Sequence, residues 1–275
     1  MTCLPDSALA PYRKLLMKTI TSADNPRFRA LLKLAHSSRE RRDAGLSLLD
    51  GIHLVAAYAE HVGAPNEIVL SRDGAENLEV AQLLASLKVD NALLLSDVLF
   101  RQLSSVATPT GIIAVVPTPR IATPQRLQGA SVWLEDIQDP GNVGSILRSA
   151  AAAGIATVCL SRHSVHAWSP RVLRAGMGAH FALQVIEGVD LTALATGYAG
   201  RIIATGMGQG KPVFKTDLTG DVALLFGNEG AGLSPALAAL AHETVHIPMP
   251  GRAESLNVGA AAAVCLFERV RQQAQ

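Results

Sequence analysis

The fold is decided by DPGNVGSILRSAAAAG (residues 139–154), together with FGNEGAGLS (226–234) and IPMPGRAESLNVGAAAA (247–263). Each segment directly follows or overlaps an apolar run that predicts a strand. The first and third continue into small-residue sequences that predict helices. Carboxyl ends of parallel strands lie along one edge of a sheet, where ligands gather. These three segments therefore predict one site at one sheet edge.

Strand and helix patterns alternate around these segments. Apolar strand patterns are SVWLEDI, ATVCLS, RIIATG, VALLFG and TVHIPM, and helical patterns separate most of them. Gly154 ends the first helix in the manner of a left-handed C-cap. Such alternation is typical of a parallel sheet covered by helices on both faces. The predicted fold class is therefore α/β, with the parallel sheet in the C-terminal domain.

A smaller α/β domain is predicted ahead of this sheet. Asn25-Pro26 is a good helix start, and EIVLS, ALLLS and GIIAVV read as strands. The segment PTPRIATPQR carries three prolines, which disfavour regular structure. Four parts are expected: a disordered extension over 1–19, in which Met17 would be the natural start; an RNA-binding domain over 20–116; a linker over 117–127; and a catalytic domain over 128–275.

Charge is unevenly distributed in a nearly neutral chain. The 275 residues are 49% hydrophobic with a net charge of +1, which suits a large buried core. Residues 13–42 nevertheless hold nine Lys or Arg against two acids. The arginines at 39, 41 and 42 belong to this segment. It is either a phosphate-facing patch or a solvated helix face.

Cysteine usage points to a reducing compartment. Cys3, Cys159 and Cys265 are far apart, so they form neither a metal-ligand pair nor a disulfide framework. No apolar stretch is long enough to span a membrane, and the N-terminus lacks a signal-peptide core. We expect a cytoplasmic protein without a metal site or a membrane association.

Glycine-rich strand ends let backbone N–H and C=O groups approach a ligand closely. Taken singly, FGNEG is more often a plain turn than a site, and NVGSILR is more often an ordinary helix start. The alanine-rich run of 259–263 is usually just close packing. All three, in this order and each at a strand end, are far more specific to a binding site.

The three segments resemble the signature motifs of the SpoU/TrmH methyltransferases. The resemblance covers 128–275 strongly. It covers 20–116 more weakly, where NPRFRALLKL and LLDGIHLV are similar to the small substrate-binding domain of the rRNA-directed members. It implies transfer of a methyl group from S-adenosylmethionine to a ribose 2′-hydroxyl of RNA, with rRNA as the favoured substrate and tRNA as the alternative. It also implies a deep trefoil knot and a homodimer formed through the C-terminal domain, whose active sites borrow residues across the interface.

The resemblance also implies roles for individual residues. Matching motif positions give the catalytic set Asn142, Arg148, Glu229, Ser255 and Asn257. The matching cofactor-binding positions are Thr205, Gly206, Gly227, Asn228, Ile247, Met249 and Leu256. Position 259 departs from the pattern, since it is Gly where many relatives have Ser or Ala.

Arg148 is the family's usual candidate for activating the hydroxyl. A guanidinium is nearly always protonated, so we expect it to hold a phosphate and stabilise developing negative charge instead. Two other classes remain as alternatives. One is a catalytically inactive RNA-binding or ribosome-assembly protein. The other is a nucleotide-binding protein using GQGK (208–211), which lacks P-loop spacing.

Overall fold

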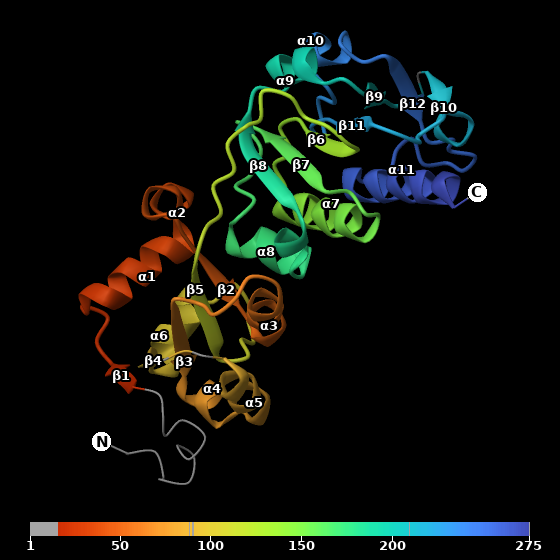
Figure 1. Cartoon of the computed structure of the whole chain (residues 1–275). Coiled ribbons are helices and arrows are strands. Elements are labelled where there is room, and N and C mark those ends of the chain that lie inside the picture. The colour runs from red at the N-terminus through yellow and green to blue at the C-terminus, as the bar shows by residue number, and fades with distance from the viewer. Residues whose placement is uncertain (1–15, 88, 90, 209, 275) are drawn as a thin grey trace. The chain divides into compact units, whose positions relative to one another are not determined.

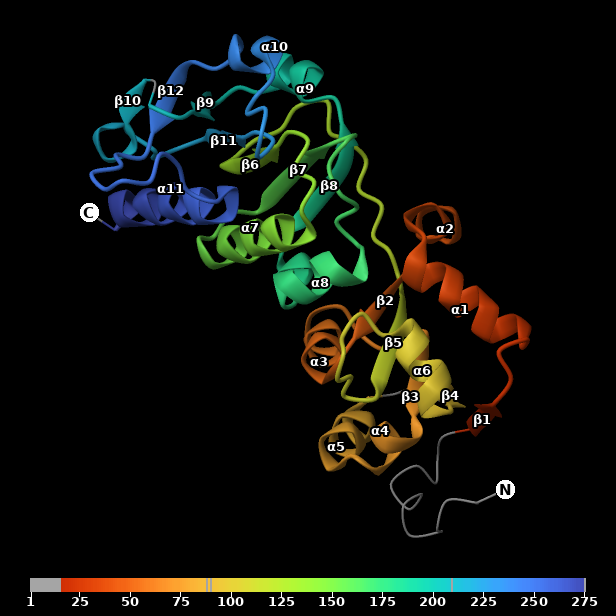
Figure 2. The same ribbon diagram turned by 180° about the vertical axis from the view of Figure 1, so that it is seen from behind.

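The structure, a computed structural model of the chain, describes residues 16–87, 89, 91–208 and 210–274 (Figures 1 and 2). The chain divides into two units. The first comprises residues up to Pro119 together with Trp168–Arg174, and the second comprises Arg120–Ala167 and the residues from Ala175 onward. The boundary after Pro119 lies within the proline-rich segment. Trp168–Arg174, by contrast, fall in the stretch that the sequence assigned to the second domain.

The first unit contains a five-stranded mixed sheet. Its strands, in spatial order, are β1 (Leu16–Ile20), β4 (Asn91–Leu95), β3 (Glu67–Ser71), β5 (Ile112–Pro117) and β2 (Leu46–Asp50). β1, β4 and β3 run parallel, whereas β5 is antiparallel to both of its neighbours. The predicted disorder over 1–19 is wrong for residues 16–19, which pair with β4. Residues 1–15, including Cys3, lie outside the described residues.

Helices flank this sheet on both sides. They are α1 (Pro26–His36), α2 (Ser38–Ala44), α3 (Ile52–His61), α4 (Arg72–Glu76), α5 (Leu78–Ser86) and α6 (Asp97–Leu103). Most of α8 (Pro170–Gly176) also belongs to this unit. Asn25 caps α1 as predicted, accepting hydrogen bonds from Arg27 N and Phe28 N. Ser37 adopts an extended conformation and caps α2, so the basic segment forms two helices.

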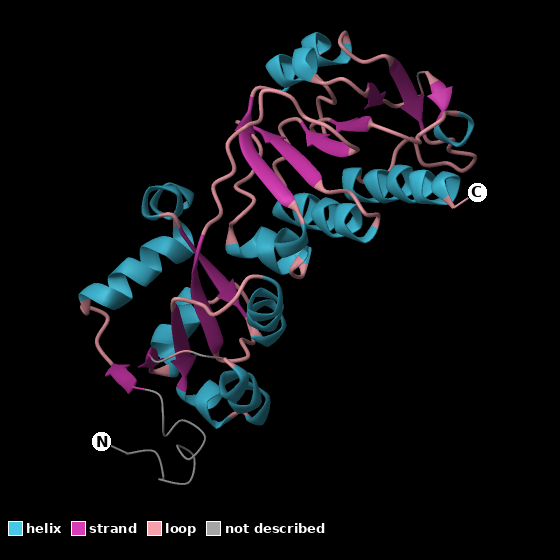
Figure 3. Cartoon of the chain, in the orientation of Figure 1, coloured by secondary structure: helices cyan, strands magenta, loops and turns pink. Residues whose placement is uncertain are grey.

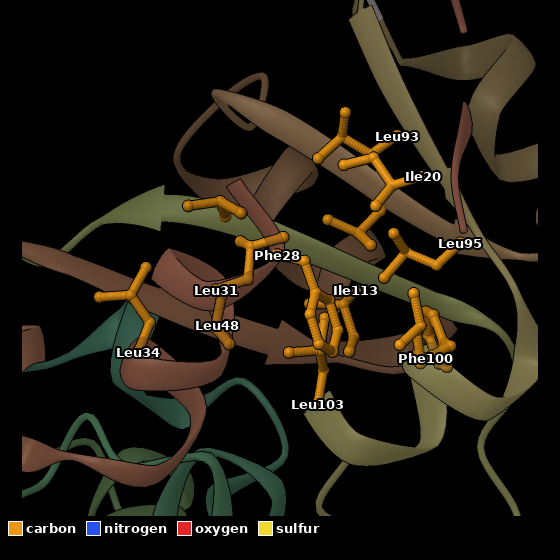
Figure 4. Packing of buried hydrophobic residues seen from close by; sticks show 13 residues of the cluster. Ile20, Phe28, Leu31, Leu34, Leu48, Leu93, Leu95, Phe100, Leu103 and Ile113 are labelled. Carbon is orange, nitrogen blue, oxygen red and sulfur yellow. The ribbon is translucent and has the colours of Figure 1, made fainter. Parts of the chain in front are cut away.

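Apolar residues of α1 and α6 fill one face of the sheet (Figure 4). Phe28, Leu31 and Phe100 are at most 1% exposed and pack with strand residues such as Ile113. Their spacing along α1 follows the helical repeat, which gives that helix one apolar stripe. α3 contacts β2, β5 and α5 on the opposite side. The RNA-binding unit predicted from the sequence is thus an α/β layer structure with its own core.

The inserted residues Trp168–Arg174 are tied to the first unit by polar contacts. Ser47 Oγ donates a hydrogen bond to Trp168 O at 3.5 Å, and Arg174 Nη1 donates to Ser105 O at 3.2 Å. Trp168 is itself buried. This seven-residue insert is therefore a structural part of the unit, although most of that unit precedes it by fifty residues or more.

The basic segment corrects one expectation from the sequence. Arg41 is only 4% exposed, and its guanidinium donates to Leu34 O at 2.6 Å and Ala35 O at 3.2 Å, closing the end of α1. It therefore cannot contact a phosphate. Other basic residues face acids: Arg27 with Glu67, Arg29 with Asp24, Lys33 with Glu40, and Arg39 with Asp43. A phosphate-binding role for exposed residues such as Arg39 stays a prediction.

The second unit contains the parallel sheet predicted from the sequence. Its strands, in spatial order, are β10 (Lys211–Pro212), β12 (Glu243–His246), β9 (Arg201–Thr205), β11 (Val222–Phe226), β6 (Ser131–Leu134), β7 (Thr157–Ser161) and β8 (Gln184–Val189). Every pairing between these named strands is parallel. The predicted α/β class is confirmed.

Helices cover both faces of this second sheet (Figure 3). α7 (Pro140–Ala152) and α11 (Val258–Gln273) pack side by side on one face, and α9 (Leu191–Gly197) and α10 (Pro235–Ala238) lie on the other. Short 3₁₀ turns occur at Ala179–Ala182 and Val213–Lys215. Side chains alternate between the two faces, so Trp133, Cys159 and Leu225 share the core beneath α9. Among the described residues, no helix is long and apolar enough to cross a bilayer.

Candidate active site

A cavity of about 990 Å³ lies at the carboxyl ends of β9, β11 and β12. The loops that follow these strands form its walls, and α11 contributes Ala261 and Cys265. All seven predicted cofactor positions line it: Thr205, Gly206, Gly227, Asn228, Ile247, Met249 and Leu256. Cavities of this size hold small-molecule ligands in proteins. The sequence therefore located the walls of this cavity correctly.

The loop after β11, residues 227–234, is named here the second-motif loop. It folds back on itself, and Gly232 N donates to Asn228 O at 2.9 Å. A Cβ on Gly227 would lie 2.2–2.4 Å from the backbone of Gly232 and Leu233, which excludes any side chain. Gly232 has a φ of 71°, in the left-handed region. Both glycines are therefore required by the loop's shape.

The side chain of Asn228, an expected cofactor-binding residue, is hydrogen-bonded within the protein. It lines the cavity, but its side-chain Nδ2 donates to Asp136 O at 2.8 Å. Its Oδ1 accepts hydrogen bonds from Gly230 N and Ala231 N, both at 3.0 Å. These bonds shape the second-motif loop, and the cofactor-binding role of Asn228 stays a prediction.

Asn142 joins the three sequence motifs. Its Nδ2 donates to Glu229 Oε1 at 2.8 Å, and its Oδ1 accepts from Asn257 Nδ2 at 2.8 Å. Asp139 caps α7 and fixes Asn142 by accepting its backbone N–H at 2.8 Å. Asn257 caps α11 through Oδ1, which accepts from Gly259 N and Ala260 N. The orientation of the Asn257 amide is therefore set by the start of its own helix, and that of the Asn142 amide by its bonds to Glu229 and Asn257.

Four of the five predicted catalytic residues are brought together. Glu229, Ser255 and Asn257 line the cavity, and Asn142 is bonded to two of them. Arg148 is the exception, since it is exposed on α7 and does not line the cavity. Six residues of α-helix advance about 9 Å and turn through more than one and a half rotations. Arg148 therefore leaves α7 on a different face from Asn142, and within one described chain the site lacks its expected cation.

Several lining residues had no role in the sequence prediction, among them Met207, His246, Glu254 and Cys265. Cys265 is 1% exposed, and burial raises its thiol pKa to about 12, so the thiol stays neutral. Helical spacing could have found it, because position 265 lies two turns beyond the start of α11. Met207 could have been found as the continuation of the RIIATG strand end.

The nucleotide-binding alternative gains no support from the geometry. Lys211, the basic residue of GQGK, lies in β10 and its Nζ is 3.0 Å from Glu243 Oε2. Residue 209 of this sequence lies outside the described residues. A phosphate loop requires a lysine free to reach the phosphates from a helix start. Lys211 instead joins the edge strand β10 to its neighbour β12.

A sequence profile of the SpoU rRNA methylase family matches residues 129–267, about half of the chain and nearly the whole second unit. The chain belongs to this family. As a SpoU protein it is a methyltransferase, which confirms the resemblance seen in the three motifs. The match includes the cavity loops and the hydrogen-bonded group of Asn142, Glu229 and Asn257, named here the junction at Asn142.

Two curated relatives span both units. The chain is 30% identical over 259 residues to the 23S rRNA (guanosine(2553)-2′-O)-methyltransferase RlmP of Bacillus subtilis, covering 91% of this chain and 98% of that protein. It is 32% identical over 271 residues to a 23S rRNA (uridine(2479)-2′-O)-methyltransferase of Streptomyces viridochromogenes, covering 93% of each. The similarity therefore extends through the smaller unit as well.

Solved structures agree with this assignment. The SpoU methyltransferase AviRb from Streptomyces viridochromogenes, crystallised with the cofactor AdoMet, superposes with a TM-score of 0.81 at 30% identity. The match covers 91% of this chain and 99% of that one. A second structure, described as an RNA 2′-O ribose methyltransferase, gives the same TM-score at 28% identity.

Proposed function

We propose that this SpoU protein transfers a methyl group from S-adenosylmethionine to a ribose 2′-hydroxyl of rRNA. The observation that carries the proposal is the junction at Asn142, which joins Glu229 and Asn257 beside the cavity. RlmP and its Streptomyces counterpart act on 23S rRNA by name, and both match the two units of this chain. An inactive RNA-binding protein would have no need of this fixed polar junction.

The cavity suits S-adenosylmethionine. Ile247, Met249 and Leu256 offer apolar surface, and the loops at 206 and 227 present backbone groups that can read an adenine. The bound cofactor would supply an electrophilic methyl group on a sulfonium. AviRb was crystallised with this cofactor in a chain of the same fold. The protein's contribution is to orient the cofactor and to exclude competing water.

The polar groups beside the cavity are placed to position the hydroxyl. Glu229 and Asn257 approach from two different loops, and Asn142 holds both. A 2′-hydroxyl must lose its proton during attack, so a fixed acceptor and a nearby positive charge both favour the reaction. Glu229 can accept a hydrogen bond from the hydroxyl through its second oxygen. Arg148 would bind the adjacent phosphate and stabilise the developing alkoxide.

Arg148 reaches a site, in this proposal, only from a second copy of the chain. It is exposed and forms no ion pair with any acid among the described residues. Phe267 on α11 is 50% exposed, and Ala260, two turns earlier on the same helix, is also exposed. An exposed apolar stripe of this kind suits a C-terminal homodimer interface. The trefoil knot belongs to the same family-based proposal.

The first unit would bind the substrate RNA. Exposed basic residues remain on α1 and α2 after Arg41 is set aside, and phosphate contacts there would be salt-sensitive. rRNA is favoured over tRNA because two relatives that match both units are named for 23S rRNA, although a third is named a tRNA/rRNA methyltransferase. A cytoplasmic location stays a prediction from cysteine usage.

Transfer of a radioactive methyl group tests the proposal. Purified protein would be given labelled S-adenosylmethionine with rRNA or tRNA from a strain that lacks the gene. Label should enter rRNA, at a ribose that resists alkaline cleavage on its 3′ side. Label in tRNA alone would show that the substrate is tRNA and not rRNA. Label in neither RNA, with the cofactor bound normally, would contradict the proposed methyl transfer.

Mixed dimers test the contribution from a second copy. Arg148→Ala and Glu229→Gln should each be inactive alone. If the arginine comes from the partner, a mixed dimer has one intact site, and random mixing should restore about a quarter of wild-type activity. If both residues act within one chain, the mixture should stay inactive.

A further inference from the structure

The end of β6 holds the second-motif loop at its exit. Glu135 immediately follows Leu134, the last residue of β6, and is partly buried. Its Oε2 accepts from Ser234 N at 2.7 Å, and its Oε1 accepts from Ser234 Oγ at 2.6 Å. Hydrogen bonds to a charged acceptor are stronger than those between neutral groups. Both carboxylate oxygens are thus committed to one residue at the end of the loop.

The next residue holds the same loop at its entrance. Asp136 O accepts from Asn228 Nδ2 at 2.8 Å. Asp136 has a φ of 55°, a left-handed conformation that costs a non-glycine residue roughly 1 kcal/mol. Ser161 at the end of β7 maintains it, because its Oγ accepts from Asp136 N at 2.8 Å and donates to Asp136 Oδ1. The turn aims the Asp136 carbonyl at Asn228.

Between these two anchors the loop has little apolar packing of its own. Glu229, Gly230, Ala231 and Gly232 are all exposed. The loop nevertheless forms one wall of the cavity and carries the carboxylate that accepts from Asn142. Its position therefore depends on polar contacts at its ends, which β6 supplies because it is the direct neighbour of β11 in the sheet.

We propose that Glu135, with the strained turn at Asp136 beside it, is a positioning residue for methyl transfer. It acts through the second-motif loop and sets the place of Glu229 relative to Asn142. Neither Glu135 nor Asp136 lines the cavity, so neither touches the cofactor directly. The inference rests on the proposed function, because it assigns Glu229 to the reacting site.

Glu135→Gln and Glu135→Ala separate positioning from general stability. A glutamine can still accept from Ser234 N and can donate its amide to Ser234 Oγ, whereas alanine can do neither. For Glu135→Ala we expect kcat to fall at least tenfold and amide hydrogen exchange of Gly230 and Ala231 to accelerate at least tenfold. Glu135→Gln should restore most of both values.

Asp221→Ala is the matched control. Asp221 lies just before β11, at the opposite end of that strand, and its carboxylate accepts from Gly129 N at 3.1 Å. This variant should lose comparable thermal stability while kcat and loop exchange stay near wild type. It therefore measures the effect of removing a carboxylate contact that lies far from the loop.

The outcomes are distinct. Unchanged loop exchange in Glu135→Ala overturns the proposal, as does faster exchange with an unchanged kcat or an equal fall of kcat in Asp221→Ala. If the wild-type protein methylates no RNA, the proposed function fails. The exchange comparison between the Ala and Gln variants then still decides whether Glu135 holds the loop.

Discussion

Asn257 donates a hydrogen bond from its side-chain amide to Asn142 Oδ1 at 2.8 Å, although the two residues are 115 positions apart. Asn257 caps α11 through its Oδ1, and the side-chain amide of Asn142, in the first turn of α7, is hydrogen-bonded at both of its polar atoms. Because Asn142 must then present its NH₂ group to Glu229, the bond fixes the direction of donation through the junction.

Asn142→Asp should break this junction without changing its size. A carboxylate cannot donate to Glu229 and would repel it, so we expect methyl transfer to fall about a hundredfold. S-adenosylmethionine affinity, measured by calorimetry, should change less than about twofold, since Asn142 does not line the cavity. Gln138→Ala, just before α7, serves as the control. Wild-type turnover in Asn142→Asp would remove the junction from the mechanism.

Gly259→Ala should disturb the same junction by way of α11, because Gly259 follows Asn257 by two residues in the first turn of that helix. A Cβ at this position would lie 2.3 Å from Ser145 Oγ, so either this hydroxyl must rotate away from Asn142 O or the start of α11 must move away from α7. We expect an activity loss of about tenfold as Asn257 withdraws from Asn142. Ser145→Ala removes the clashing oxygen and leaves a Cβ at 3.6 Å, so the double variant should recover activity. If the double variant is as inactive as Gly259→Ala, the glycine is not needed to avoid a clash with Ser145.

Arg41→Ala should lower stability and Arg39→Ala should not. Arg41 is buried and satisfies two carbonyls at the end of α1, and unsatisfied buried carbonyls cost about 1–3 kcal/mol. Arg39 is exposed and paired only with Asp43, so its removal should stay within about 0.5 kcal/mol. Urea unfolding measures both. RNA affinity, measured well below the melting temperatures, should instead fall in Arg39→Ala and stay near wild type in Arg41→Ala. Arg39→Ala should also flatten the dependence of RNA affinity on salt.

Arg148→Ala should leave thermal unfolding and cofactor affinity near wild type while methyl transfer falls by orders of magnitude. The side chain is exposed on α7, so the core loses nothing. Arg148→Lys keeps the charge but loses the planar fork. A poor Lys variant would indicate bidentate phosphate binding, and a largely recovered rate would indicate charge alone. Loss of folding in Arg148→Ala would instead identify a structural role.

Acid should weaken the second unit through His180. This ring is 2% exposed, its Nε2–H donates to Ala167 O at 2.9 Å, and burial lowers its pKa to about 4. The unfolded chain protonates this ring near pH 6.5, so the free energy of unfolding should fall as pH drops from 6.5 towards 4, by about 3 kcal/mol in total. His180→Gln keeps a donor without titrating. If the free energy of unfolding depends on pH in the same way in the wild type and in His180→Gln, His180 is not the group responsible.

The sequence predicted the second unit well because its strands are apolar runs and its loops carry glycine at strand ends. It missed β8, whose run is interrupted by Glu187 and Gly188, and β10, which has only two residues. In the first unit the division at Ser37 was not predicted, because the polar residues that follow Ala35 include no glycine or proline before Gly45 to mark a break. Periodicity reports one face of an element, and a single capping residue can divide that element without altering the period.

For the site, the sequence predicted which loops form the cavity, but not which side chains meet beside it. Motif positions located the cavity walls, because backbone loops at strand ends need only the strand pattern. Helix rotation separated Arg148 from Asn142, which a spacing of six residues does not reveal unless the helix is drawn. The bonds from Glu135 to Ser234 also escaped prediction, because they join positions 99 residues apart through strand adjacency alone.

The insert Trp168–Arg174 means that the gene does not encode the first unit in one continuous stretch. A recombination or engineered fusion at Pro119 would transfer an incomplete unit, leaving Ser47 and Ser105 without Trp168 and Arg174. Grafting a foreign second unit onto this first unit would therefore succeed only if the donor carried a compatible seven-residue segment. In this chain, the first unit cannot be exchanged without also altering the sequence that runs through the second.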